Sequence, residues 1–148
     1  MSDPLTSNPE PEANLGYLFR LAYQRFRSAL NEALEDLGLS VQEYVILSVF
    51  ETRPELSTAE LARITQVTRQ TMHTTVLALE AAGLLERRPK NQRVVLVRPT
   101  KRGHRALSAA TGRVRAVEQS ALAGLSTGDE RVVRTWLANV AKEHRTGS

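Results

Sequence analysis

Apolar residues recur at steps of three and four along most of this chain, the spacing that places them on one face of a helix. The first such segment covers residues 14–37 and ends at Gly38, a residue type that commonly terminates helices. Three further helices are predicted behind Ser40, Ser57 and Thr68, because a hydroxyl at a helix N-terminus can accept a backbone hydrogen bond. The pattern therefore predicts four helices before the spacing of apolar residues changes from helical to strand-like.

The period changes after Gly83. Residues 84–88 and 93–98 are predicted to form strands, because the second segment is β-branched and apolar and the Pro-Lys-Asn-Gln between them supplies turn residues. Helical spacing returns over residues 101–125 and in a last helix behind Ser126. The sequence predicts a mainly α fold with a small β-hairpin, namely a winged helix-turn-helix flanked by N- and C-terminal dimerisation helices.

These elements divide the chain into three parts. Residues 1–13 contain three prolines and little that is apolar, so a disordered leader is expected. Residues 39–100 hold the winged helix-turn-helix, and residues 14–38 with 101–146 form a helical dimerisation region. The helix over 101–125 would be about 37 Å long, more than so small a core can cover. We therefore expect a homodimer, with a monomeric fold-back bundle as the alternative.

The charge balance points to a polyanionic partner. The 148 residues carry 20 bases and 16 acids, a formal net charge of +4. Three of the acids lie in the first 14 residues, so the remainder has 20 bases against 13 acids, or +7. A sequence pI near 10.0 favours nucleic acid as the partner. No apolar run is long enough to span a bilayer and no signal peptide opens the chain, so a cytoplasmic protein is expected.

The bases gather around the predicted wing. Between Arg87 and Arg105 there are eight bases and no acid, whereas a solvated surface normally mixes both signs. The second helix of a helix-turn-helix can enter a major groove. The residues opposite its predicted inward stripe of Met72, Val76 and Leu79 face outward, and they are Arg69, Gln70, His73, Thr74 and Leu77. This combination predicts a protein that binds double-stranded DNA.

The sequence offers no constellation for catalysis or metal binding. Cysteine is absent, which excludes disulfides, thiolate chemistry and Cys-ligated zinc. His73, His104 and His144 fall on different predicted elements without the spacing of metal ligands. No Ser-His-Asp arrangement or phosphate-cradling glycine loop is present. We therefore expect no enzyme activity, no metal and no cofactor.

Several short motifs follow one another along the chain. They are Leu56-Ser57-Thr58-Ala59-Glu60-Leu61-Ala62, Val67-Thr68-Arg69-Gln70-Thr71, Leu79-Glu80-Ala81-Ala82-Gly83-Leu84-Leu85-Glu86-Arg87, Asn91-Gln92-Arg93 and Thr100-Lys101-Arg102-Gly103. In this order and spacing, they resemble the MarR family of bacterial transcription regulators. The likeness covers roughly residues 14–145. Together with the outward helix face, it implies a DNA site made of Ser57, Thr68, Arg69, Gln70, His73, Thr74, Arg87, Lys90, Asn91 and Arg93.

Three features depart from the family pattern. The family usually has Asp two residues before the wing arginine, and Asn91 at this position predicts a looser wing, because an ion pair is lost. His73 and Thr74 replace the usual Thr-Arg, so a phosphate contact is expected to be missing and His73 to read bases. Pro99 replaces a leucine and should stiffen the exit from the wing.

The resemblance implies a sequence-specific homodimeric repressor on a palindromic operator, released by a small aromatic or phenolic ligand. Such a ligand would lie where the DNA-binding part meets the dimer helices, with Tyr23, Arg27 and Tyr44 as candidate lining residues. Core or rim packing is the plain alternative for each of the three. A different class of function stays open, namely a winged helix that serves as an architectural or protein-interaction module without operator or ligand.

Overall fold

The computed structural model describes residues 9–142, so residues 1–8 of the predicted leader and His144 lie outside the described residues. The chain divides into two compact units, Met1–Val117 and Glu118–Ser148. Among the described residues, no helix is both long and apolar enough to cross a membrane.

The first unit opens with α1 (Leu15–Leu34), whose N-terminus is capped by the Asn14 side chain. A 3₁₀ turn, η1 (Glu35–Leu37), follows and ends at Gly38 with φ of 68°. The α-helix thus ends three residues earlier than the segment 14–37 predicts. The chain tightens into i→i+3 bonding before the left-handed glycine, which is a common way to end a helix.

Helix α2 (Val41–Ser48) continues as the 3₁₀ turn η2 (Val49–Glu51). It begins with a capping box, in which the Ser40 hydroxyl accepts from the Glu43 backbone and the Glu43 carboxylate accepts from the Ser40 backbone. The N-cap predicted at Ser40 is therefore confirmed.

The helix-turn-helix consists of α3 (Thr58–Thr65) and α4 (Arg69–Ala81). Ser57 forms a second capping box with Glu60, and the Thr68 hydroxyl accepts from the Thr71 backbone at the start of α4. Both predicted caps are confirmed. Gln66 makes the tight connection between the helices, with φ of 56°.

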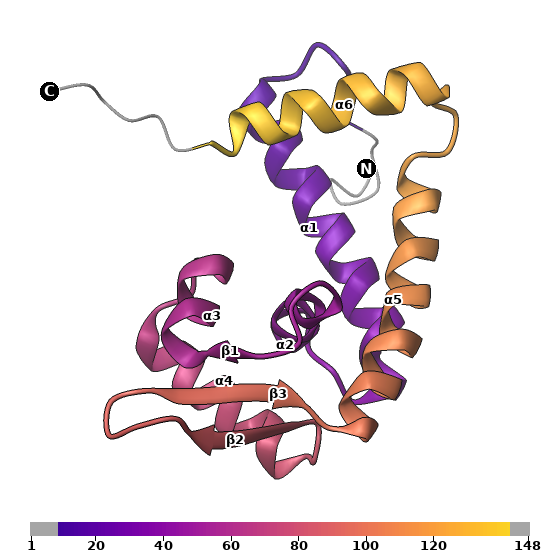
Figure 1. Ribbon diagram of the computed structural model, residues 1–148. Coiled ribbons are helices and arrows are strands. Elements are labelled where there is room, and N and C mark those ends of the chain that lie inside the picture. Colours follow the sequence, from indigo (N-terminus) through magenta and orange to yellow (C-terminus); the bar gives the residue numbers. More distant parts are fainter. Residues whose placement is uncertain (1–8, 143–148) are drawn as a thin grey trace, which may run out of the picture. The chain divides into compact units, whose positions relative to one another are not determined.

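A three-stranded antiparallel sheet stands beside these helices (Figure 1). Its strands are β1 (Leu56–Ser57), β2 (Leu85–Pro89) and β3 (Val95–Pro99), in the order β1-β3-β2. Hairpin β2–β3 is the predicted wing. The sequence missed β1, which pairs Leu56 with Val97 of β3 and thereby attaches the wing to the residues immediately before α3.

One hydrophobic core joins the elements of the first unit. The predicted inward stripe of α4 is buried, with Met72, Val76 and Leu79 each at most 1% exposed. Helix α5 (Lys101–Ala121) contributes Leu107 and Ala110 to the same cluster. The remaining core members include Leu34, Ile46, Leu47, Phe50, Leu61, Leu85 and Val97.

The end of α4, the start of β2 and the start of α5 meet at one tight junction. Thr100 connects all three, because its hydroxyl donates to the Gly83 carbonyl at 2.6 Å and accepts from the Gly103 amide at 3.0 Å. Position 103 requires glycine because the backbone at Leu84 lies very close to it: a Cβ atom at this position would be 2.0 Å from the Leu84 carbonyl oxygen. The Thr100-Lys101-Arg102-Gly103 motif therefore fixes where α5 leaves the wing.

The second unit contains the last turn of α5 and helix α6 (Thr127–Val140). The helix predicted over residues 101–125 ends at Ala121, because the chain turns through Gly124 with φ of 91°. The predicted cap at Ser126 is confirmed, since its hydroxyl accepts from the Asp129 amide. No described residue of α6 is buried, and its apolar stripe is exposed at Val132, Trp136, Leu137 and Val140.

Candidate nucleic-acid interface

The outward face of α4 is exposed, as predicted. Arg69, Gln70, His73 and Thr74 are all exposed, and Leu77, one turn further along, is 38% exposed. Within the described part of the chain, the side chains of Arg69, Gln70 and His73 make no hydrogen bond or ion pair, so their polar groups are available to a ligand. The buried stripe on the opposite face fixes this orientation of the helix.

The hydroxyl groups proposed for the same site already have intramolecular partners. Ser57 accepts from the Glu60 amide at 3.1 Å, and Thr68 accepts from the Thr71 amide at 3.1 Å. Thr74 donates to the Gln70 carbonyl at 3.1 Å. These side chains position the backbone of α3 and α4, and a hydroxyl oxygen retains capacity for one further bond.

The tip of the wing is closed by Asn91. Its side-chain oxygen accepts from the backbone amides of Arg93 at 2.9 Å and Val94 at 3.0 Å, while the Lys90 amide donates to the Val94 carbonyl. Asn91 thus stabilises the turn through the backbone, without the ion pair that an aspartate would add. Lys90 and Arg93 are exposed at the tip, and neither forms an ion pair within the described residues.

The strands of the wing carry three ion pairs. Arg87 pairs with Glu80 at 2.7 Å, Arg88 with Glu55 at 2.8 Å and Arg98 with Glu86 at 2.6 Å. The predicted single-sign patch from Arg87 to Arg105 is therefore wrong for these three bases. Their three acidic partners, Glu55, Glu80 and Glu86, lie outside that segment. Within the described residues, the bases left without an ion pair are Lys90, Arg93, Lys101, Arg102 and Arg105.

These pairs change the electrostatics of their carboxylates. Hydrogen bonds from the Arg87 guanidinium lower the pKa of Glu80 below its ordinary 4.5, and those from Arg88 do the same to the pKa of Glu55. In turn, the pKa of Arg87 and that of Arg88 are raised. The pairs are therefore fully charged at neutral pH and tie β2 both to α4 and to the residue before β1.

Two of the three candidate ligand residues lie together on α1. The Arg27 guanidinium donates to the Tyr23 hydroxyl at 3.1 Å, and both side chains are exposed. Tyr44 lies on α2, half-buried against the core. On the neighbouring turn η1, Asp36 forms an ion pair with Arg113 of α5. A role for any of the three in ligand binding stays a prediction.

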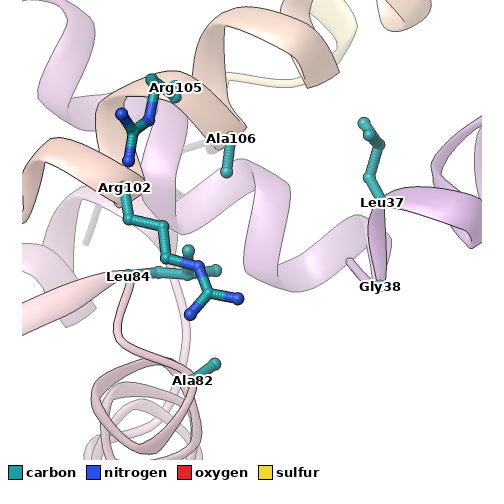
Figure 2. A pocket seen from close by; sticks show the side chains of 7 residues that line it. All are labelled: Leu37, Gly38, Ala82, Leu84, Arg102, Arg105 and Ala106. Carbon is teal, nitrogen blue, oxygen red and sulfur yellow. The ribbon is translucent and has the colours of Figure 1, made fainter.

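A pocket that the sequence did not predict lies between η1, the connection from α4 to β2, and the start of α5 (Figure 2). Its volume is about 460 Å³, and its lining includes Leu37, Ala82, Leu84, Arg102, Arg105 and Ala106. None of Tyr23, Arg27 and Tyr44 belongs to the lining. The only signal in the sequence was the i,i+3 spacing of Arg102 and Arg105 behind the wing, which by itself does not indicate a cavity. The described residues contain no group of three or more acids or histidines able to hold a metal ion.

Comparisons with known proteins agree with this geometry. A sequence profile of the MarR family matches residues 37–93. The HTH-type transcriptional repressor Rv2887 of Mycobacterium tuberculosis is 34% identical over 134 residues, which cover 89% of this chain and 96% of that protein.

Solved structures of the same relative are similar to this chain. Rv2887 in complex with DNA superposes with a TM-score of 0.72 at 34% identity, covering 88% of this chain and 100% of that one. Rv2887 in complex with salicylic acid gives a TM-score of 0.67 at 34% identity, covering 88% and 98%. The winged helix-turn-helix, its motif order and this similarity over nearly the whole length lead to one conclusion. The chain belongs to the MarR family.

Proposed function

We propose that this protein is a homodimeric transcriptional repressor that binds a palindromic DNA operator and is released by a small aromatic acid. The proposal rests on two surfaces of the first unit. The outward face of α4 carries the exposed side chains of Gln70 and His73, and the wing tip carries Lys90 and Arg93, which form no ion pair within the described residues. One surface suits base edges in a major groove and the other suits phosphates or a minor groove. The relatives named as repressors, and the complex of Rv2887 with DNA, support this proposal.

The residues then divide by role. Gln70 and His73 read bases, because both present donors and acceptors with the reach to form specific bonds. Arg93 enters the flanking minor groove, and Arg69 and Lys90 contact phosphates. Ser57, Thr68, Thr74 and Asn91 shape the backbone and present polar atoms to DNA, while Arg87 contacts phosphate from its pair with Glu80. In this scheme residues 39–100 form the DNA-binding part.

The dimer is proposed from exposed apolar surface. Leu15 of α1 is 57% exposed, and on α6 Val132 is 68% and Leu137 44% exposed. Burying such stripes against a second copy removes apolar area from water, which favours association. Residues 14–38 and 101–146 would supply this interface. A two-fold dimer then presents two copies of α4 to successive major grooves, about 34 Å apart.

The effector is proposed to be a small aromatic carboxylate or phenol. Tyr23, Arg27 and Tyr44 offer two aromatic rings and one guanidinium, which can pair with a carboxylate or phenolate. The structure of Rv2887 with salicylic acid supports this class of ligand. The ligand acts by favouring a spacing of the two recognition helices that does not fit DNA. We place the protein in the cytoplasm, where it meets chromosomal DNA.

Fluorescence anisotropy tests the proposal with a DNA duplex enriched from a random pool and a scrambled duplex of the same composition. A repressor binds the enriched duplex about 10³-fold or more tightly than the scrambled one at physiological salt. An architectural module binds both alike. Salicylate at millimolar concentration should then release the operator, and Arg27→Gln should weaken that release. If substitution of Arg27, Tyr23 or Tyr44 leaves the release unchanged, the effector binds elsewhere.

A further inference from the structure

The pocket at the base of the wing differs from the rest of the basic segment in its charges. Arg87, Arg88 and Arg98 are each neutralised by a glutamate. In the described chain, Arg102 and Arg105 form no ion pair, and no acidic residue lines their pocket. They stand three residues apart on α5, so two like charges share one helix face and repel each other. An anion between them would relieve this repulsion.

The shape of the pocket suits an organic molecule. Its volume of about 460 Å³ lies within the range of ligand sites, roughly 300–1,000 Å³. Leu37, Leu84 and Ala106 provide apolar walls from three separate elements. Figure 2 shows the Arg102 side chain passing Leu84 toward Ala82 at the end of α4. The lining thus combines apolar side chains with two cationic ones.

The local backbone holds Arg102 in this place. Its guanidinium lies beside Gly83, where a Cβ atom would be in ordinary van der Waals contact with Arg102 Nη1 at 3.6 Å. Thr100 caps the start of α5 through the Gly103 amide, which puts Arg102 in the first turn of a 21-residue helix. The positive end of the helix dipole adds to the attraction for an anion near the guanidinium.

We propose that this pocket binds a small organic anion, with its apolar body against Leu37 and Leu84 and its carboxylate between Arg102 and Arg105. A concave, apolar-walled site favours a free ligand over DNA, because a phosphate backbone is contacted by groups that project from the surface. The pocket adjoins the end of the recognition helix and the first residue before the wing. A bound ligand therefore influences the positions of the recognition helix and the wing. Its effect on DNA binding rests on the proposed function, whereas the binding of the ligand to the pocket does not.

The test uses 2-naphthoate as the probe and DNA-free full-length protein, with binding measured by isothermal titration calorimetry. Arg102→Gln and Arg105→Gln should each weaken binding by about tenfold, because each removes charge-assisted hydrogen bonds. Arg115→Gln is the matched control, since it removes the same charge from an exposed position about 15 Å further along α5. It should change the affinity by less than about twofold.

Two further measurements keep the proposal falsifiable. Ala82→Leu keeps both arginines but fills the pocket from an exposed position, so it should also weaken naphthoate binding, with circular dichroism verifying the fold. The neutral isostere 2-naphthamide should bind far more weakly than the acid. The proposal is overturned if the amide binds equally well, or if Arg27→Gln abolishes naphthoate binding while Arg102→Gln and Arg105→Gln do not affect it. It is also overturned if these two variants weaken DNA binding alone, which would make both arginines phosphate contacts.

Discussion

Arg87 of β2 is held by Glu80 in the last turns of α4 through two hydrogen bonds, Nε to Oε2 at 2.7 Å and Nη2 to Oε1 at 3.0 Å. This ion pair joins the recognition helix to the first strand of the wing. Arg88 makes a similar two-point contact with Glu55, just before β1. The helix and the hairpin that are proposed to contact DNA are therefore fixed to each other by charge as well as by the core.

Replacing Glu80 with Gln should lower the midpoint of thermal unfolding at neutral pH, because the amide cannot form the charged pair. The pair lowers the pKa of Glu80 in the folded chain below its ordinary 4.5. Its stabilisation is thus present above that ordinary pKa and is lost as the pH falls through the lowered value. Thermal melts of wild type and variant should therefore converge as the pH falls below 4.5. A difference that stays constant across this range would mean that the charge of Glu80 contributes nothing.

Replacing Arg93 with Ala should weaken binding to every DNA sequence by a similar factor, since the charge that this exposed arginine brings into the minor groove is attracted by the flanking phosphates whatever the sequence. The slope of log affinity against log salt should decrease by about one. Arg98→Ala is the control, because it removes the same charge from the same hairpin but at a side chain that Glu86 already holds. Equal effects of the two substitutions on the salt slope would argue against a special role for the wing tip.

Replacing Gln70 or His73 with Ala should reduce discrimination between operator and scrambled DNA more than it reduces binding to scrambled DNA. Both side chains are exposed on the face opposite the buried Met72 and Val76. A side chain that makes good bonds to a base edge contributes about 1–3 kcal/mol of discrimination. Parallel titrations on both duplexes measure this difference. If affinity falls equally on both, the residues contact the DNA backbone.

Replacing Gly103 with Ala should destabilise the fold by about 1–3 kcal/mol, as overpacking of a close contact does. The new Cβ atom would lie 2.0 Å from the Leu84 carbonyl oxygen, so α5 and the residue before β2 must move apart. Gly112→Ala is the matched control on the same helix, with nothing within 4 Å of its Cβ position. It should stabilise the helix by roughly 0.5–1 kcal/mol. Urea unfolding compares the two variants, and a Gly103→Ala protein as stable as wild type would refute the close approach.

Local features of the fold could be predicted from the sequence, because their causes lie within a few residues. The caps at Ser40, Ser57, Thr68 and Ser126 and the buried stripe of α4 follow from short-range spacing, and the structure confirms them. Strand β1 could not be predicted, because its two residues become a strand only by pairing with β3 some 40 residues later, Leu56 opposite Val97.

The candidate site was predictable in its outline and not in its charges. The outward face of α4 follows from helical periodicity alone. The pairing of Arg88 with Glu55 spans 33 residues, so nothing near Arg88 in the sequence reveals it. For the same reason, the pocket at Arg102 could not be expected, since Leu37 and Leu84 reach it from distant parts of the chain.

Selection of bound sequences from a random pool of DNA duplexes, using the full-length protein, shows whether the protein recognises a symmetric operator. We expect an inverted repeat whose half-sites are centred about 10 base pairs apart, because two recognition helices related by a two-fold axis enter successive major grooves. No enriched sequence, or a single half-site without a symmetric mate, would contradict a homodimeric, sequence-specific repressor.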